Sequence, residues 1–353
     1  MTATPLTIIT GFLGAGKTTL LNRILSADHG LKIAVLVNDF GAVNIDAQMI
    51  VNVEGETYSL SNGCICCTIR EDLVKAVLDV LNRADPPEYI VIETSGVSDP
   101  LEVALTLRPI NAITIDSILT VIDAEQIASL ERQYAVLAMN QVGMADIVIL
   151  NKVDLVDAAG LAKARAYIKR VMPDTRIFET SHAAVPLPLI LNVGTFDAER
   201  LASRAPDDVH VHEAGEHSAH TGHDHPDHAL AFSTWTYTSP KPMSLKALQR
   251  MIENLPDSIY RAKGTVYLAD EPDAPSLLQV VGRRATITPQ TGGWNGRLPI
   301  NQLVFIGTHG GIDPEMLASQ LEAGLAENAP KNELERMTNA ALAWLRRIRQ
   351  PEN

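Results

Sequence analysis

The segment from Gly11 to Thr18 has the residue types and the spacing of a loop that binds phosphate. It reads G-F-L-G-A-G-K-T, which fits the pattern G-x-x-x-x-G-K-[ST] and lies between an apolar run and a helical pattern. Its glycines let backbone N–H groups turn inward around a β-phosphate. Lys17 is expected to reach the β- and γ-phosphates as a catalytic residue, and Thr18 to offer its hydroxyl to Mg²⁺. The predicted nucleotide-binding residues in and after this loop are Gly11, Gly14, Ala15, Gly16, Lys17, Thr18 and Thr19.

A second motif, Asn151-Lys152-Val153-Asp154, follows an apolar strand pattern and indicates specificity for guanine. The carboxylate of Asp154 can accept hydrogen bonds from N1–H and from the 2-amino group of guanine, whereas adenine offers neither donor. Asn151 can brace the pocket and Lys152 can cover the base. Ser181 follows the next strand and can also approach the base. The sequence therefore predicts that GTP, rather than ATP, binds here.

The motif Glu93-Thr94-Ser95-Gly96 closes another apolar strand pattern and supplies the acid that a phosphate site needs. Glu93 can hold Mg²⁺ through water and is the second predicted catalytic residue, while the N–H of Gly96 can sense a γ-phosphate. Asp39 and Asp46 lie in a loop after the second strand, where nucleotide-sensing switches are usual, and Asp46 is a further Mg²⁺ candidate. No glutamine directly follows Gly96, where many GTPases hold the residue that orients water. These motifs predict Mg²⁺-assisted hydrolysis of GTP.

Three thiols, those of Cys64, Cys66 and Cys67, are the only cysteines and fall within four positions. Thiolates are soft ligands that suit Zn²⁺, and three of them on one loop leave a coordination position open, as a site that passes its metal onward requires. The alternative is three buried, inert cysteines. Because such a cluster cannot build a disulfide framework, it indicates a reducing compartment, and the protein is expected in the cytoplasm.

Apolar segments that alternate with helical patterns must position these motifs. Strands are predicted at Leu6–Thr10, Lys32–Asn38, Glu88–Thr94, Ser117–Asp123, Ala145–Asn151 and Thr175–Ser181, and helices at Lys17–Ala27, Glu71–Arg83 and Leu161–Val171. This alternation predicts an α/β fold, a P-loop GTPase domain with a mostly parallel sheet and helices on both faces, over residues 1–200.

The second half of the chain predicts a smaller α+β domain over residues 229–326, after a His-rich flexible linker at 201–228. Residues 210–228 hold seven of the ten histidines and show no apolar period. Strand patterns at Leu230–Ser239, Ile259–Ala269, Leu277–Thr288 and Gln302–Gly307 then surround helices at Leu245–Leu255 and Pro314–Ala326. A C-terminal helix is predicted within 327–353, at Glu333–Arg349.

The composition excludes two classes of partner. Lys and Arg number 29 against 42 Asp and Glu, and the net charge of −13 disfavours nucleic acid. No apolar run is long enough to cross a membrane, and the N-terminus lacks the pattern of a signal peptide.

Taken in order, these motifs resemble the CobW family of metallochaperone GTPases. The resemblance rests on the phosphate loop, Asn38-Asp39-Phe40-Gly41, Cys64-Ile65-Cys66-Cys67, Glu93–Gly96 and Asn151–Asp154, and extends more weakly to Arg261-Ala262-Lys263-Gly264 and Leu303–Gly307. It implies a GTPase whose Cys-x-Cys-Cys loop binds a transition metal, most simply Zn²⁺ or else Co²⁺, and delivers it to a client metalloprotein. Family members often have Glu at the position of Asp39, which the resemblance makes a further metal ligand.

Two other functions fit part of this pattern. One is a regulatory GTPase switch that senses metal without delivering it. The other is a P-loop kinase or ATPase in which the thiols are incidental, a reading that Asp154 opposes.

Overall fold

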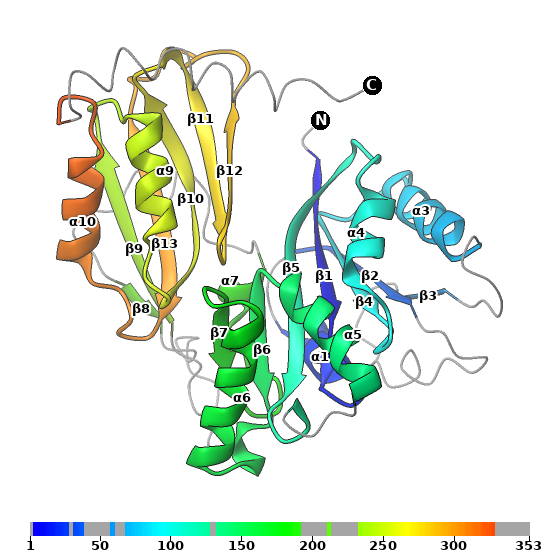
Figure 1. The fold of residues 1–353 in the computed structure, drawn as a ribbon. Coiled ribbons are helices and arrows are strands. Elements are labelled where there is room, and N and C mark those ends of the chain that lie inside the picture. Colours follow the sequence, from blue (N-terminus) through cyan, green and yellow to red (C-terminus); the bar gives the residue numbers. More distant parts are fainter. Residues whose placement is uncertain are drawn as a thin grey trace, which may run out of the picture. The chain divides into compact units, whose positions relative to one another are not determined.

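The computed structural model describes residues 3–27, 31–38, 57–60, 68–127, 132–191, 210–212 and 232–328. The chain divides into two compact units, Met1–Thr195 and Phe196–Asn353 (Figure 1). Several predictions fall outside the described residues. They are the metal candidates Asp39, Asp46, Cys64, Cys66 and Cys67, and the C-terminal helix Glu333–Arg349.

The first unit is built on a seven-stranded sheet in which every pairing is parallel, with the strand order β3-β2-β4-β1-β5-β6-β7. Its strands are β1 (Thr4–Thr10), β2 (Ile33–Asn38), β3 (Thr57–Leu60), β4 (Tyr89–Thr94), β5 (Ile113–Asp123), β6 (Ile147–Asn151) and β7 (Arg176–Glu179). The run Tyr-Ile-Val-Ile-Glu-Thr of β4 is buried at every position, as strands covered on both faces require. The predicted parallel α/β fold is confirmed, and β3 is an addition to the predicted strands.

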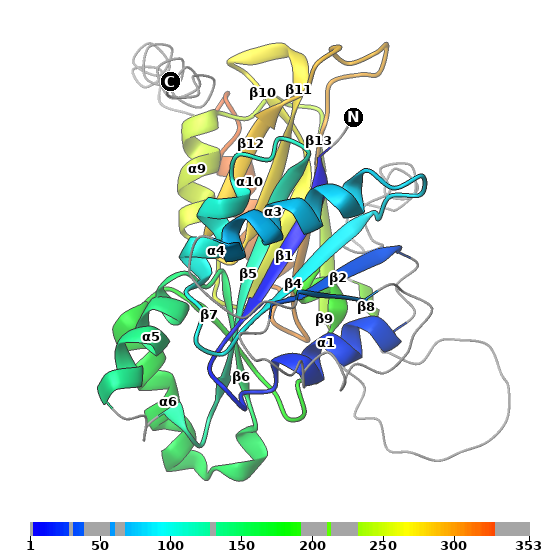
Figure 2. The same cartoon turned by 90° about the vertical axis from the view of Figure 1, so that its right-hand side faces the viewer.

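Helices cover both faces of this sheet. They are α1 (Lys17–Ser26), α3 (Thr68–Leu81), α4 (Pro100–Leu107), α5 (Arg132–Gly143), α6 (Ala158–Val171) and the short α7 (Leu187–Ile190), with a 3-10 turn, η2, at Val153–Leu155. Figure 2 shows α1 on one side of the strands and α5 and α6 on the other. One apolar cluster joins α3 and α4 to β1, β2 and β4, and another joins α5 and α6 to β5 and β6. The burial of these apolar stripes holds the helices in place.

Helix α4 is absent from the predicted elements although its first turn carries a clear signal. Asp99 caps it by accepting a hydrogen bond from the backbone N–H of Leu101, Pro100 occupies the first turn, and Glu102 places a negative charge at the positive end of the helix dipole. Helix α5 was likewise not predicted. Its sequence has little apolar periodicity, because one of its inward residues is the polar Gln141.

The second unit is an antiparallel six-stranded sheet with the order β12-β11-β10-β13-β9-β8 and two helices packed on it. The strands are β8 (His210–His212), β9 (Phe232–Ser239), β10 (Ile259–Leu268), β11 (Glu271–Val281), β12 (Arg284–Pro289) and β13 (Asn301–Thr308). Helix α9 (Leu245–Glu253) begins at Ser244, whose hydroxyl accepts from the N–H of Ala247, and α10 (Pro314–Ala323) begins at Asp313. The predicted α+β architecture of this half is confirmed.

Two predictions for this unit are wrong in detail. The single strand pattern Leu277–Thr288 is a hairpin, because Gly282 adopts φ 56°, a left-handed conformation that lets the chain reverse between β11 and β12. Part of the predicted flexible linker, His210–His212, is the edge strand β8, paired with Phe232–Thr234 of β9. An edge strand can be polar because it need not bury both faces.

No helix among the described residues combines the length and the apolar character needed to cross a lipid bilayer.

Candidate nucleotide site

The predicted nucleotide-binding residues gather at one edge of the parallel sheet. β1 ends at Thr10, directly before the phosphate loop, and β4 ends at Thr94, within the acidic motif. β6 ends at Asn151, at the start of the base motif, and Ser181 follows β7 by two residues. Parallel strands place all their carboxyl ends at the same edge, where ligands of α/β proteins bind. The topology alone thus brings together residues separated by up to 170 positions (Gly11 to Ser181).

Two glycines of the phosphate loop are required by close contacts rather than by flexibility. At Gly11, φ is 136° and a Cβ would lie 2.0 Å from the backbone oxygen of Val121. At Gly16, φ is 107° and a Cβ would lie 2.3 Å from the side-chain nitrogen of Asn151. No larger residue fits either position without moving β5 or the base motif.

Lys17 lies at the start of α1 and is 7% exposed. Its ammonium group donates a hydrogen bond to the backbone oxygen of Phe12 across the loop, at 3.2 Å. The lysine thus reaches across the phosphate loop. A phosphate bound by the backbone N–H groups of this loop would lie beside a positive charge that is already in place. Thr19, the next residue but one, is exposed on the same helix turn.

Thr18 and Glu93 form the oxygen-rich side of the site. The hydroxyl of Thr18 donates to Oε1 of Glu93 at 2.9 Å, and Glu93 is 2% exposed. Behind them, the hydroxyl of Thr94 donates to that of Thr10 at 2.9 Å, which ties β4 to β1. A hydroxyl beside a carboxylate is a set of hard oxygen donors that fits Mg²⁺.

Asn151 braces the phosphate loop against the loop after β7. It is 2% exposed, its amide nitrogen donates to the backbone oxygen of Ala15 at 2.9 Å, and its amide oxygen accepts from the N–H of Ala183 at 2.8 Å. The predicted bracing role therefore has a geometry: one side chain joins three loops.

Lys152 is held by an acid that the sequence analysis did not single out. Its ammonium group lies 2.7 Å from Oδ2 of Asp123, which ends β5 and is almost fully buried. Asp123 also accepts from the N–H groups of Glu125 and Gln126. Lys152 has a left-handed backbone with φ 60°, a conformation rare for lysine. The sequence signal for this pair is the acid that ends β5. This apolar strand lies next to β6, which ends in Asn151.

Asp154 and Ser181 meet at the base end of the site. A hydrogen bond from the Ser181 side chain lowers the pKa of the Asp154 carboxyl below its ordinary value, and a backbone hydrogen bond acts in the same direction. An aspartate is already ionised at neutral pH, and the lowered pKa extends that charge to more acidic solution, so Asp154 can accept from two guanine donors. The two residues predicted separately to approach the base are thus adjacent.

Comparison with known proteins identifies the whole chain. The model of the CobW/HypB/UreG nucleotide-binding domain matches residues 5–179, and that of the C-terminal domain of the cobalamin synthesis protein cobW matches residues 232–325. The zinc chaperone CobW of Pseudomonas aeruginosa is 32% identical over 363 residues, which cover 91% of this chain and 92% of that protein. The chain belongs to the CobW family. The resemblance seen in its motifs is confirmed, and the protein is a GTPase of this family.

A second relative supports this membership. The zinc-regulated GTPase metalloprotein activator 1 of Dictyostelium discoideum is 32% identical over 332 residues, covering 80% of this chain and 67% of that protein. The solved Zn(II)-bound YjiA GTPase from E. coli shares 25% identity over 92% of this chain and 99% of that one, with a TM-score of 0.41, too low to carry an argument about the fold.

The metal site expected of this CobW family protein is not among the residues that the structure describes. Among the residues that the structure describes, no three His, Cys, Asp or Glu side chains gather as a metal site requires. The predicted thiol ligands and Asp39 lie outside those residues. Their roles therefore remain predictions.

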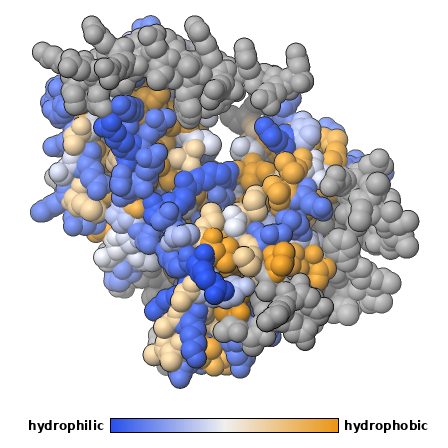
Figure 3. Space-filling model, viewed as in Figure 1, coloured by the Kyte–Doolittle hydropathy of each residue, from blue (hydrophilic) through white to orange (hydrophobic). Residues whose placement is uncertain are grey.

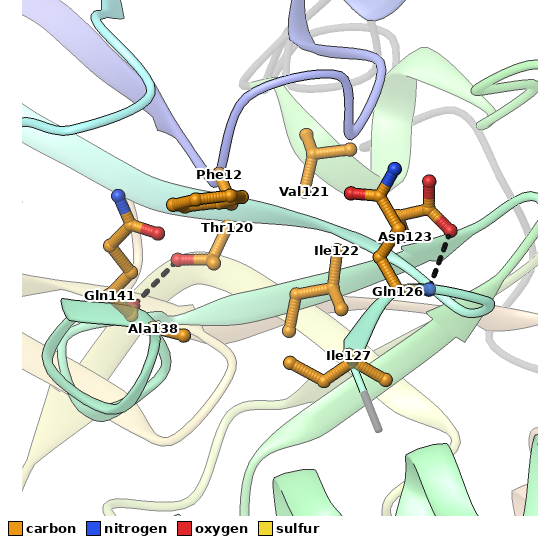
Figure 4. Close-up of a pocket in the computed structure, with 9 residues that line it drawn as sticks. All are labelled: Phe12, Thr120, Val121, Ile122, Asp123, Gln126, Ile127, Ala138 and Gln141. Atoms are coloured by element: carbon orange, nitrogen blue, oxygen red, sulfur yellow. Dashed lines mark hydrogen bonds between the residues drawn. The ribbon is translucent and has the colours of Figure 1, made fainter. Parts of the chain in front are cut away.

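A small hollow lies beside the phosphate loop, between β5 and α5 (Figure 4). Phe12 of the loop lies at one end, the side chains of Thr120 and Ile122 belong to β5, and Gln141 belongs to α5. Apolar side chains share its lining with polar ones, and Gln141 is the polar residue that α5 contributes. Its amide was not marked by any local motif.

Replacing Asn151 with alanine should weaken both the fold and nucleotide binding of this protein. Two buried backbone groups, the oxygen of Ala15 and the N–H of Ala183, would lose their partner, which costs about 2–4 kcal/mol of unfolding free energy. Urea unfolding followed by circular dichroism measures the loss, because the tryptophans lie at 235, 294 and 344, outside the first unit. Asn140→Ala, an exposed asparagine on α5, is the control and should change stability by less than about 0.5 kcal/mol. Equal stabilities of the two variants would rule out the bracing role.

Proposed function

We propose that this GTPase uses the hydrolysis of GTP to deliver a transition metal ion, Zn²⁺ or else Co²⁺, to a client metalloprotein in the cytoplasm. The observation that carries the proposal is the relationship to proteins named zinc chaperone, which covers over nine tenths of both chains in the Pseudomonas aeruginosa case. The three clustered thiols give this chain the ligand type that such a metal needs.

The nucleotide half of the proposal assigns a role to each residue of the site. Lys17 neutralises charge on the β- and γ-phosphates, and the N–H of Gly96 contacts the γ-phosphate. Asp154, with Ser181 beside it, accepts from guanine, while Asn151 and Lys152 keep the base loop in place. The proposal also assigns nucleotide contacts to the backbone of Gly11, Gly14, Ala15 and Gly16, and to Thr18 and Thr19 in the first turn of α1.

Thr18 and Glu93 would hold Mg²⁺, and Asp46 is proposed as a further ligand in its shell. The ion would supply charge neutralisation between the β- and γ-phosphates. The hydroxyl of Thr18 donates its proton to Glu93, which leaves its lone pairs available to such an ion. In this proposal, Glu93 contributes to hydrolysis by keeping its carboxylate where it would hold the Mg²⁺ ion.

The metal half of the proposal places the cargo on Cys64, Cys66 and Cys67, with Asp39 as an oxygen ligand. Leu60 ends β3 at the carboxyl edge of the sheet, and the cysteines follow it by four to seven residues in the sequence. β3 pairs with β2, and β2 pairs with β4, the strand that carries Glu93. This order supports coupling between the cargo and the nucleotide.

Exposed apolar side chains support the client half of the proposal. Leu101 and Leu105 on α4, and Val136 and Met139 on α5, are between 41% and 63% exposed. Figure 3 shows apolar surface over these two helices. Apolar residues gathered at a surface mark contacts with other proteins.

Cys66→Ser tests whether metal and GTP are coupled. A neutral hydroxyl is a far poorer ligand than a thiolate, so Zn²⁺ affinity should fall about a hundredfold or more. GTP affinity without metal should stay as in the wild type. Titration of GTP with and without Zn²⁺, and of Zn²⁺ with and without a non-hydrolysable GTP analogue, should give equal coupling factors in the wild type, because linkage is reciprocal. In Cys66→Ser, both coupling factors should equal one, which means that neither ligand changes the affinity for the other.

A transfer assay then separates delivery from sensing. Zn²⁺-loaded protein is mixed with an apo-client under GTP, GDP or the analogue, and the metal on the client is counted. Transfer that depends on GTP supports a chaperone. Coupling without any transfer would instead identify a metal-sensing switch, and the absence of coupling in the wild type would end the proposal even if both ligands bind.

A further inference from the structure

We propose that Gln141 is a positioning residue for GTP hydrolysis, which orients the backbone of the loop Gly96–Ser98 toward the γ-phosphate. The proposal rests on the assignment above of the Gly96 N–H as a γ-phosphate contact. It adds a residue from α5, a helix that contains none of the nucleotide motifs.

The amide of Gln141 is buried and points at the loop that follows Glu93. Gln141 is 1% exposed, and its amide nitrogen donates to the backbone oxygens of Ser98 at 3.2 Å and of Gly96 at 3.4 Å. An amide nitrogen carries two protons, so each carbonyl can receive one. A buried amide is costly unless it is hydrogen-bonded, and these two bonds give the donors of Gln141 their partners.

Gly96 is held between Gln141 and the phosphate loop. On one side, a Cβ added to Gly96 would lie 2.7 Å from both the backbone nitrogen and the side chain of Leu13. On the other side, its carbonyl accepts from Gln141. A glycine has no side chain to fix its orientation, and its backbone rotates freely. The contact with Leu13 limits how close the loop can come. The carbonyl of Gly96 belongs to the peptide that follows the one carrying its N–H, so the bond from Gln141 holds the backbone directly after the γ-phosphate contact.

Gln141 itself is fixed to the sheet. The hydroxyl of Thr120, on β5, donates to the backbone oxygen of Gln141 at 2.7 Å (Figure 4). The neighbours Ala138 and Val142 are buried in the cluster that joins α5 to β5 and β6. An anchored donor can keep a phosphate contact within the small tolerance that catalysis needs.

Gln141→Met removes the two donors and keeps the length and burial of the side chain. We expect the loop to lose its orientation, so that kcat for GTP falls about tenfold, since small misplacements are costly in catalysis. The preference for a non-hydrolysable GTP analogue over GDP should fall by a similar factor. GDP affinity should stay as in the wild type, because GDP has no γ-phosphate. Displacement of a fluorescent nucleotide from the full-length chain measures both affinities.

Ser117→Ala is the matched control. It removes buried hydrogen bonds to Thr7 and to the backbone oxygen of Ile190 from the same strand, β5, and should lower the melting temperature, but it leaves the anchor of Gln141 and the bonds to Gly96 and Ser98 in place. A merely structural role for Gln141 predicts the same nucleotide preference in both variants, and that result would overturn the proposal. A loss of preference in Gln141→Met alone would support it.

Gln141→Glu gives an independent readout. Its carboxylate would face two carbonyl oxygens, so kcat should be lower than in Gln141→Met at high pH and should recover relative to the wild type as the acid protonates and donates again. A flat ratio across the pH range would contradict the proposal. These tests need no metal cargo. If the wild type hydrolyses GTP and the Gln141 variants match it, only this inference fails, whereas a wild type without GTPase activity would remove the proposed function itself.

Discussion

Lys17→Ala is expected to lower kcat for GTP hydrolysis about a thousandfold, the effect of removing a preorganised charge from a developing transition state. Lys17 is 7% exposed and bonds to Phe12 across the loop, so its charge stands at the phosphate position without reorganisation. Alanine is a good helix former at the first residue of α1, so the fold should remain. The measurement is single-turnover hydrolysis, with each protein in excess over GTP and concentrated enough to bind all of it.

The matched control is Lys163→Ala, an exposed lysine on α6. It removes the same charge from the chain and should leave kcat unchanged. Circular dichroism confirms that each variant is folded. A folded Lys17→Ala protein with turnover near that of the wild type would show that the phosphate loop is not where GTP is hydrolysed.

Asp154→Asn is expected to change which base the protein prefers. GTP affinity should fall about a hundredfold, because the amide cannot accept from both guanine donors and leaves one of them unpaired. Xanthosine triphosphate should bind better than it does to the wild type, since the amide can donate to the 2-oxo group. The pKa of Asp154 is lowered by Ser181, so the wild-type acid stays charged through the neutral range and the difference should not depend on pH there.

Asp157→Asn controls for the loss of an acid three residues away. Asp157 caps α6 by accepting from the N–H of Gly160, and asparagine caps helices about as well, so this variant should keep both its stability and its preference for GTP. Competition between GTP and xanthosine triphosphate for a fluorescent nucleotide decides the matter. An Asp154→Asn protein that still prefers GTP would place the base pocket elsewhere.

The strands that carry the site were predictable because burial on both faces leaves a continuous apolar run. β4 and β6 begin within two residues of their predicted starts and end where predicted. The hairpin at Gly282 was not predictable in this way, since Gly282-Arg283 interrupts an otherwise strand-like run without the usual Asn-Gly or Asp-Gly signal. The edge strand β8 was missed because the three residues His-Val-His are too short a pattern and gain a strand conformation only by pairing with β9.

The contacts of the site can also be divided into those that the sequence predicts and those that it does not. Asp154 and Ser181 could be placed near one base because each follows a strand of the same parallel sheet. The bond of Gln141 to Gly96 joins residues 45 positions apart, and that of Lys152 to Asp123 joins residues 29 apart. No local pattern marks Gln141, and Asp123 is marked only as the acid that ends β5. Such contacts depend on which side chains the packed helices and strands turn toward each other, which a motif does not encode.

The brace made by Asn151 has a consequence for how the protein is synthesised. Its amide joins Ala15, near the start of the chain, to Ala183, and these bonds can form only once all three residues have left the ribosome. Until then the nascent chain exposes apolar strands without the partners that cover them. A ligand stabilises a chain only when it binds the folded form. A polypeptide that stalls before Ala183 therefore lacks the complete brace, and any stabilisation by GTP that depends on the brace comes only after that residue has been added.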